Sequence, residues 1–376
     1  MAKPKVSLGE LEERYQHEDR GVGQERNDFL LPQILDFVHQ KKWMNLQPEY
    51  QRRQVWDNKK KSQFIESLLM NLPIPPVFLF EPEYSRYEVM DGQQRLSAIV
   101  SFYSNRFKLT GLEYWPDLNG FSYLDLPQMI QRGLDRRRLS AVILQSTSHE
   151  KNDDELRRIV FERLNTGGQK LNAQELRNCI YSSEFSKLLV ELAGYESFND
   201  LLGMPRYTDN IIKGQISQKL AENIFFKRMI DCELVLRFFA FRKKSNIKGS
   251  IKSMLDRCMV THLATDGDLL SELASDFRSR VGLAKDLFGG DAFKLKDFDK
   301  DQDKVSPPFY DAIIIACDRQ FSNKDQLIRK GAELKLELEK ALADEETYEL
   351  IVGRANTAEA IKKRLDLVEK IFIGVL

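Results

Sequence analysis

The apolar residues in the first half of the chain follow two different patterns. Short apolar runs bounded by Gly, Pro or charged turns predict strands at 77–80, 87–90, 107–112 and 139–144. Between them, apolar residues recur three and four positions apart, which is typical of amphipathic helices. Such helices are expected at 30–39, from Asp57 or Asn58 to about Leu69, from Leu96 to Tyr103, just after Pro127, at 153–164, and from Asn172 onward. This mixture predicts an α+β domain.

Past about residue 200 the strand pattern fades and long helical patterns dominate. Glycine and proline are confined to connections there, and 286–308 has the composition of a charged loop. We therefore predict a polar lead-in at 1–27, an α+β domain at 28–200 and an all-helical domain at 201–376. A length of 376 residues suits two domains.

The segment Tyr87–Ser97, YEVMDGQQRLS, predicts a strand, a tight turn and a helix start. A helix start has unpaired N–H groups and partial positive charge, so it suits an anion. Arg95 could bind phosphate with two donors, and Asp91 could cap the helix, orient Arg95 or hold a metal. A simpler interpretation is an ordinary Asp-Gly helix cap beside a solvated arginine.

Two other segments are more polar than a fold alone requires. The pattern Tyr50-Gln51-Arg52-Arg53-x-x-Trp56 combines arginines, an amide and two aromatic residues, a set that can clamp phosphates and stack on a base. For Trp56 by itself, packing into the core is the favoured interpretation. Phe161–Gln169 ends a helix in Asn-Thr-Gly-Gly, which allows close approach to a ligand or forms a simple glycine cap. Glu175 is three residues after Asn172, as in a capping box.

The charge balance, the cysteines and the absence of long apolar runs limit the classes of function that the sequence allows. The chain has 57 basic and 57 acidic residues, so no global charge indicates nucleic-acid binding. A local patch is present at Arg132 and 136–138, for which a solvated basic loop is the simpler interpretation. Four scattered cysteines, with no C-x-x-C pair, argue for a reducing cytoplasm. No secretory signal or membrane-spanning apolar run is found, and no histidine-rich nuclease pattern is present.

The order YQRRQVW, PIPPVFLFE, YEVMDGQQRLSAI and FERLNTGGQKLNAQELRN closely resembles the N-terminal domain of GmrSD-type restriction endonucleases. The resemblance covers roughly residues 30–185 and implies a ParB/sulfiredoxin-like core. It also implies binding and hydrolysis of a nucleoside triphosphate with Mg²⁺, in bacterial defence against foreign DNA. A separate effector or nuclease is the implied partner.

The resemblance assigns roles to individual residues. Asp91, Gln94 and Arg95 would be catalytic, with Asp91 also the metal ligand. Nucleotide binding would involve Tyr50, Gln51, Arg52, Trp56, Gly92, Gln93, Asn165 and Gly168. For DNA contact, the basic residues Arg53, Arg136, Arg137 and Arg138 are the candidates.

The second half departs from family members fused to an HNH nuclease. His262 is the only histidine after residue 200, and the Glu333-Leu-Lys335 triplet sits in a leucine-rich helical stretch. This favours a sensor or regulatory component over an intrinsic nuclease. Three alternatives stay open: a DNA-binding module without catalysis, a metal-dependent nuclease that uses Asp91 directly, and a structural adaptor.

Overall fold

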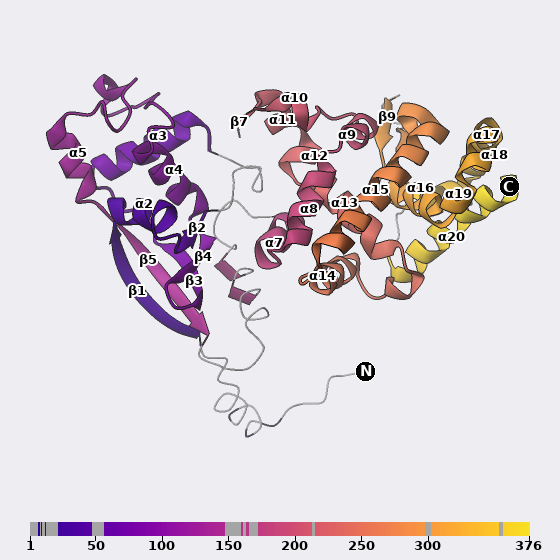
Figure 1. The fold of residues 1–376 in the computed structure, drawn as a ribbon, viewed down its shortest axis with the longest axis horizontal. Helices are drawn as coiled ribbons and strands as arrows, with labels where there is room; N and C mark the ends of the chain where they lie inside the picture. The colour runs from indigo at the N-terminus through magenta and orange to yellow at the C-terminus, as the bar shows by residue number, and fades with distance from the viewer. Residues whose placement is uncertain are drawn as a thin grey trace. The chain divides into compact units, whose positions relative to one another are not determined.

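The computed structural model describes residues 22–46, 56–146, 172–212, 215–297, 302–352 and 356–376, with a few isolated positions elsewhere (Figure 1). These residues form two compact units, divided between Lys170 and Leu171. Each unit has its own hydrophobic core.

The first unit is built on a five-stranded mixed sheet with the strand order β1-β5-β3-β4-β2. β3 pairs parallel with β5 and antiparallel with β4, while β1 pairs antiparallel with β5 along its whole length. β2 is a short parallel addition to β4. The strands are β1 (Val22–Leu30), β2 (Met44–Asn45), β3 (Val77–Glu83), β4 (Arg86–Asp91) and β5 (Arg138–Ser146).

Within the continuous described stretches of the first unit, four α-helices accompany this sheet. They are α2 (Leu31–His39), α3 (Asn58–Leu69), α4 (Gln93–Tyr103) and α5 (Gln128–Asp135). Apolar residues of α2, α3 and α4 form one core with inward residues of β3 and β5. α3 begins as the sequence predicts, because the Asp57 carboxylate accepts the Lys60 N–H at 2.7 Å.

The second unit is dominated by helices around a large apolar core. In chain order they are α7 (Ala173–Ile180), α8 (Glu184–Ala193), α9 (Glu196–Leu202), α10 (Tyr207–Asn210), α11 (Gln218–Glu222), α12 (Ile224–Lys227), α13 (Ile230–Phe241), α14 (Ile251–Thr261), α15 (Gly267–Phe288), α16 (Pro307–Arg319), α17 (Lys324–Arg329), α18 (Gly331–Ala343), α19 (Glu345–Val352) and α20 (Ala358–Val375). Two small ladders interrupt them: β6 (Ile211–Ile212) with β7 (Gln215–Ile216), and β8 (Lys294–Asp297) with β9 (Gln302–Val305).

The general architecture, an α+β region followed by a helical one, is confirmed. The unit division lies earlier than the predicted boundary at residue 200, because apolar residues of α8 and α9 pack into the helical core. α7 belongs to the same unit. The second unit is also not purely helical, since the predicted charged loop at 286–308 contains the β8–β9 ladder. Leu295 in β8 and Phe293 just before it are buried.

Two other sequence predictions were wrong. Residues 22–27 belong to β1 and not to a polar lead-in; the strand lies at the edge of the sheet, where polar side chains are tolerated. Residues 107–112 form no strand. Leu109 exchanges two backbone hydrogen bonds with the 120–121 turn, and its burial comes from packing on the helices.

Candidate functional site

The turn between β4 and α4 requires a glycine at position 92. Gly92 has φ of 93°, and a Cβ built on it would lie 2.3 Å from Val77 Cγ1 and 2.9 Å from Val77 Cβ. A larger residue would therefore be strained in its backbone and would also collide with β3. The close neighbour is protein, so packing of the turn on β3 explains this glycine without any ligand.

Arg95 ties three parts of the chain together at this turn. Its guanidinium donates to Asp91 Oδ2 at 2.8 Å, to the Pro76 carbonyl at 3.3 Å and to the Pro75 carbonyl. The Arg95 side chain is 14% exposed and that of Asp91 is 52% exposed. Burial lowers the pKa of Arg95, and the Asp91 carboxylate opposes this shift. Arg95 thus holds Asp91 in place, and Asp91 faces solvent.

Gln94 connects the start of α4 to the residue that precedes α3. Its side-chain oxygen accepts the Trp56 main-chain N–H at 3.0 Å. The Trp56 ring packs edge-on against Phe64, with 5.5 Å between ring centroids, and the Lys60 ammonium lies 5.8 Å from the Trp56 ring. Half-buried Trp56 therefore packs on α3, as the simpler interpretation expected, and Gln94 fixes its backbone.

Within the described part of the chain, no side chain caps the first turn of α4. Gly92 is the N-cap and supplies no side chain, and Asp91 bonds to Arg95 without capping the helix. Gln93 is buried at the same turn. The sequence allowed Asp91 to cap the helix, to orient Arg95 or to hold a metal. Of these, the structure shows the contact between Asp91 and Arg95.

Asp91 suits a metal only as a single ligand. Among the described residues, no group of three or more His, Cys, Asp or Glu is arranged to hold an ion. Mg²⁺ commonly binds one or two carboxylates together with substrate phosphates and water. The carboxylate present therefore fits a Mg²⁺ ion that arrives with a nucleotide and does not build a complete cage.

Several predicted site residues lie outside the described part of the chain. These are Tyr50, Gln51, Arg52, Arg53, Asn165 and Gly168. Just after that gap, the predicted capping box is present. Asn172 accepts the N–H groups of Gln174 and Glu175, and Glu175 accepts the Asn172 N–H at 2.7 Å.

The three candidate DNA-binding arginines at 136–138 do not act as one patch. Arg137 is half-buried and donates to the Leu69 carbonyl at 2.9 Å, so it joins the end of α3 to the start of β5. Arg136 and Arg138 are exposed, and Arg138 is the first residue of β5. Two of the three are therefore accessible, and Arg137 serves the fold.

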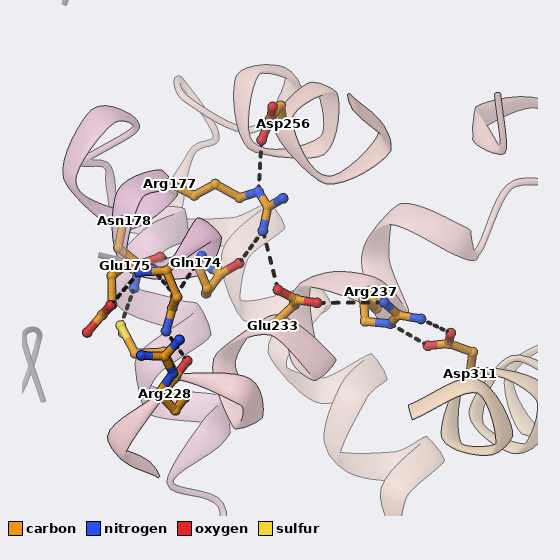
Figure 2. A network of polar contacts seen from close by, with 11 residues as sticks. Gln174, Glu175, Arg177, Asn178, Arg228, Glu233, Arg237, Asp256 and Asp311 are labelled. Carbon is orange, nitrogen blue, oxygen red and sulfur yellow. Dashed lines mark hydrogen bonds and ion pairs between the residues drawn. The ribbon is translucent and has the colours of Figure 1, made fainter. Parts of the chain in front are cut away.

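A chain of charged residues inside the second unit was not predicted from the sequence (Figure 2). Arg177 contacts Asp256 at 2.8 Å and Glu233 at 3.5 Å, and Glu233 also lies 3.6 Å from Arg237. Arg237 then binds Asp311 with two hydrogen bonds, one at 2.9 Å. Charged positions in the otherwise apolar α13 and α16 were the available signal.

Residues 32–182 match the model of the GmrSD restriction endonuclease N-terminal domain. This stretch is a domain of that family. It includes the whole Asp91–Arg95 turn and ends just after α7, so the GmrSD-type domain extends into the second unit. Comparisons with curated proteins and with solved structures returned no match. Within the described residues, every helix is too short or too polar to span a membrane.

Proposed function

We propose that the GmrSD-type domain binds and hydrolyses a nucleoside triphosphate at the turn between β4 and α4. It would do so as the sensor or regulatory component of a bacterial restriction or anti-phage system, with a separate effector. One observation carries the proposal: Arg95 fixes a solvent-facing Asp91 at a helix start that no described side chain caps.

Each of the few polar groups at this turn would have its own role in binding or hydrolysis of the nucleotide. The N–H groups of the first turn of α4 would donate to phosphate oxygens, since a helix start favours negative charge. Asp91 would hold the Mg²⁺ of the nucleotide, or orient the attacking water. Bound there, Mg²⁺ would neutralise charge that develops on the phosphates. Arg95 and Gln94 are engaged by the protein and would position Asp91 and the turn.

The test is phosphate release by the purified protein with each common ribonucleoside triphosphate and Mg²⁺, with and without DNA. We expect Asp91→Ala to abolish turnover, whereas Asp117→Ala, at an exposed carboxylate elsewhere in the same unit, should not. Arg95→Ala should also weaken nucleotide binding, because Asp91 would lose its only described ion-pair partner. Equal turnover in wild type and Asp91→Ala would remove this turn as the site.

Absence of turnover would be followed by thermal denaturation of the same samples with nucleotide. A nucleotide-dependent rise in Tm that Asp91→Ala loses would mean a binding sensor without intrinsic hydrolysis. No rise in Tm with any nucleotide would refute nucleotide recognition by the isolated protein.

A further inference from the structure

The arginine of the turn between β4 and α4 is already occupied by the protein. Arg95 donates to Asp91 and to the carbonyls of Pro75 and Pro76. Sites that transfer phosphoryl groups balance the charge of the phosphates with Lys or Arg in addition to the metal ion. A nucleotide site at this turn therefore calls for a basic residue from another element.

The element that begins beside this turn is α3. Gln94, in the first turn of α4, accepts the main-chain N–H of Trp56 at 3.0 Å, and α3 begins shortly after Trp56. Apolar residues of α3 and α4 also share the core of the first unit. The first residues of α3 are thus held close to the start of α4.

One face of α3 is used to hold the loop that follows α4. The Lys59 side chain lies along Gly111, since a Cβ built on Gly111 would lie 3.0 Å from Lys59 Cγ. Three positions further along α3, Ser62 Oγ accepts the Thr110 N–H at 3.0 Å. Lys59 therefore belongs to the face that packs on this loop.

Lys60 lies on a different face of the same helix. Its ammonium is 5.8 Å from the centroid of the Trp56 ring. One helical turn further along, Phe64 packs edge-on against the same ring, with 5.5 Å between ring centroids. Lys60 is therefore on the side of α3 that carries Trp56, the residue through which Gln94 connects α3 to the start of α4.

The Lys60 ammonium is accessible to an anion. The side chain is exposed, and the Trp56 ring is its one contact among the described residues. Asp57 accepts the main-chain N–H of Lys60 at 2.7 Å and forms no ion pair with its ammonium within the described contacts. A cation–π contact at an exposed site is weak, so it places the ammonium near the turn without withholding it from phosphate. The next lysine, Lys61, is buried.

We propose that Lys60 binds the phosphate chain of the nucleotide at the turn between β4 and α4. This inference rests on the function proposed above and adds a residue that the sequence did not assign to the site. A lysine ammonium is a point charge on a flexible stem, so it can contact phosphate oxygens without a fixed geometry. Arg95 then positions Asp91, and Lys60 supplies the positive charge that Arg95 spends on the protein.

The test measures binding of inorganic tripolyphosphate, and of each common ribonucleoside triphosphate, to the full chain by isothermal titration calorimetry with Mg²⁺. Tripolyphosphate carries the phosphates without a base. Lys60→Gln removes the charge, and Lys60→Arg keeps it. Lys59→Gln is the matched control, because it removes the same charge from the adjacent exposed residue on the other face of α3. Asp91→Ala tests the site itself.

Wild type, Lys59→Gln and Lys60→Arg should bind with similar affinity. Lys60→Gln should bind about tenfold or more weakly, as expected for the loss of one hydrogen bond between charged groups. Equal affinities of Lys60→Gln and Lys59→Gln, with a loss in Asp91→Ala, would overturn the role of Lys60 and leave the nucleotide site standing. No binding of any of these ligands by wild type would overturn both.

Two controls separate charge from folding. Thermal denaturation without ligand should give the same Tm for Lys60→Gln and Lys59→Gln, and a fall in Tm confined to Lys60→Gln would reassign its effect to packing on Trp56. In the wild-type protein, tripolyphosphate should slow acetylation of Lys60 by acetic anhydride but not acetylation of Lys59. Equal acetylation of the two lysines with and without the ligand would contradict the proposal without relying on a variant.

Discussion

Each unit contains an arginine–aspartate pair, but the two pairs lie in opposite surroundings. In the first unit Arg95 holds Asp91, whose side chain is 52% exposed. In the second, Arg237 holds Asp311, whose side chain is 0% exposed. The same chemistry therefore leaves one carboxylate open to a ligand and encloses the other in the core, and burial separates a candidate site from a structural contact.

The enclosed pair also has more partners. Arg237 lies near Glu233, which in turn reaches Arg177 on α7, as Figure 2 shows. Burial raises the pKa of Asp311, although the Arg237 guanidinium acts in the opposite direction. Removal of Asp311 would leave the buried Arg237 guanidinium only its 3.6 Å contact with Glu233, whereas removal of both Asp311 and Arg237 leaves no such buried charge.

The largest effect is expected from Asp311→Ala. Arg237 would lose both hydrogen bonds from its buried guanidinium, so the free energy of unfolding of the helical unit should fall by about 3–5 kcal/mol. Urea unfolding followed by far-ultraviolet circular dichroism measures this change. The double variant Asp311→Ala, Arg237→Met should recover much of the loss. A loss below about 1 kcal/mol in the single variant would show that Arg237 is readily solvated.

Gly92→Ala tests the other side of the comparison, where the turn that carries Asp91 also packs closely on β3. The added Cβ would meet Val77, and φ of 93° is unfavourable for alanine. We expect a loss of about 1–3 kcal/mol in the first unit, together with displacement of Asp91. Hydrogen exchange of β3 and β4 amides locates the loss in that unit. Combining Gly92→Ala with Val77→Ala should relieve the collision but not the backbone strain. If the double variant recovered the full stability, strain at the positive φ of residue 92 would not contribute to the loss.

The sequence predicted those parts of this comparison that depend on local spacing. The caps at Asp57 and Asn172, the strands at 77–80 and 87–90 and the turn at Asp91–Arg95 all follow from residues a few positions apart. β1 was missed because an edge strand carries little apolar alternation.

Contacts between distant segments were not predictable in this way. Arg95 is bound by the carbonyls of Pro75 and Pro76, and Gln94 by the backbone of Trp56, only after β3, α3 and α4 have packed together. The sequence therefore indicated the residues of the candidate site, and the roles it predicted for Gln94 and Arg95 toward a ligand stay predictions. The structure adds the contacts that both side chains make with the protein.

Gln94→Ala should have a smaller effect than either substitution above. It removes one hydrogen bond to the Trp56 N–H, which contributes about 1 kcal/mol. Gln94→Glu keeps an acceptor oxygen at the same place and should retain most of this stability. If the NH2 group of the Gln94 amide were the essential part, Gln94→Ala and Gln94→Glu would be destabilised equally. Trp56 fluorescence, measured in a background where Trp43 and Trp115 are replaced by Phe, should shift in Gln94→Ala and not in Gln94→Glu.

The smallest effect is expected at a surface pair in the second unit. Asp200 accepts two hydrogen bonds from Arg206, both at 2.8 Å, and these bonds lower the pKa of Asp200. A lowered carboxyl pKa stabilises the fold above the pKa of the unfolded chain, and this contribution is lost as pH falls through the folded-state pKa. Asp200→Asn should therefore destabilise the protein at neutral pH by less than about 1 kcal/mol, since exposed ion pairs are weak.

The pH profile decides whether that small effect belongs to the ion pair. The unfolding free energies of wild type and Asp200→Asn should differ at neutral pH and converge in acid. Asp286→Asn, at an exposed aspartate on α15, is the matched control for the change of carboxylate to amide. A difference that persists in acid would mean that the introduced amide disturbs packing. Convergence would complete the comparison of Asp200 with Asp311, since each carboxylate is bound by an arginine. The loss of unfolding free energy on substitution should be larger for the more buried carboxylate, because water can replace the lost partner only at the surface.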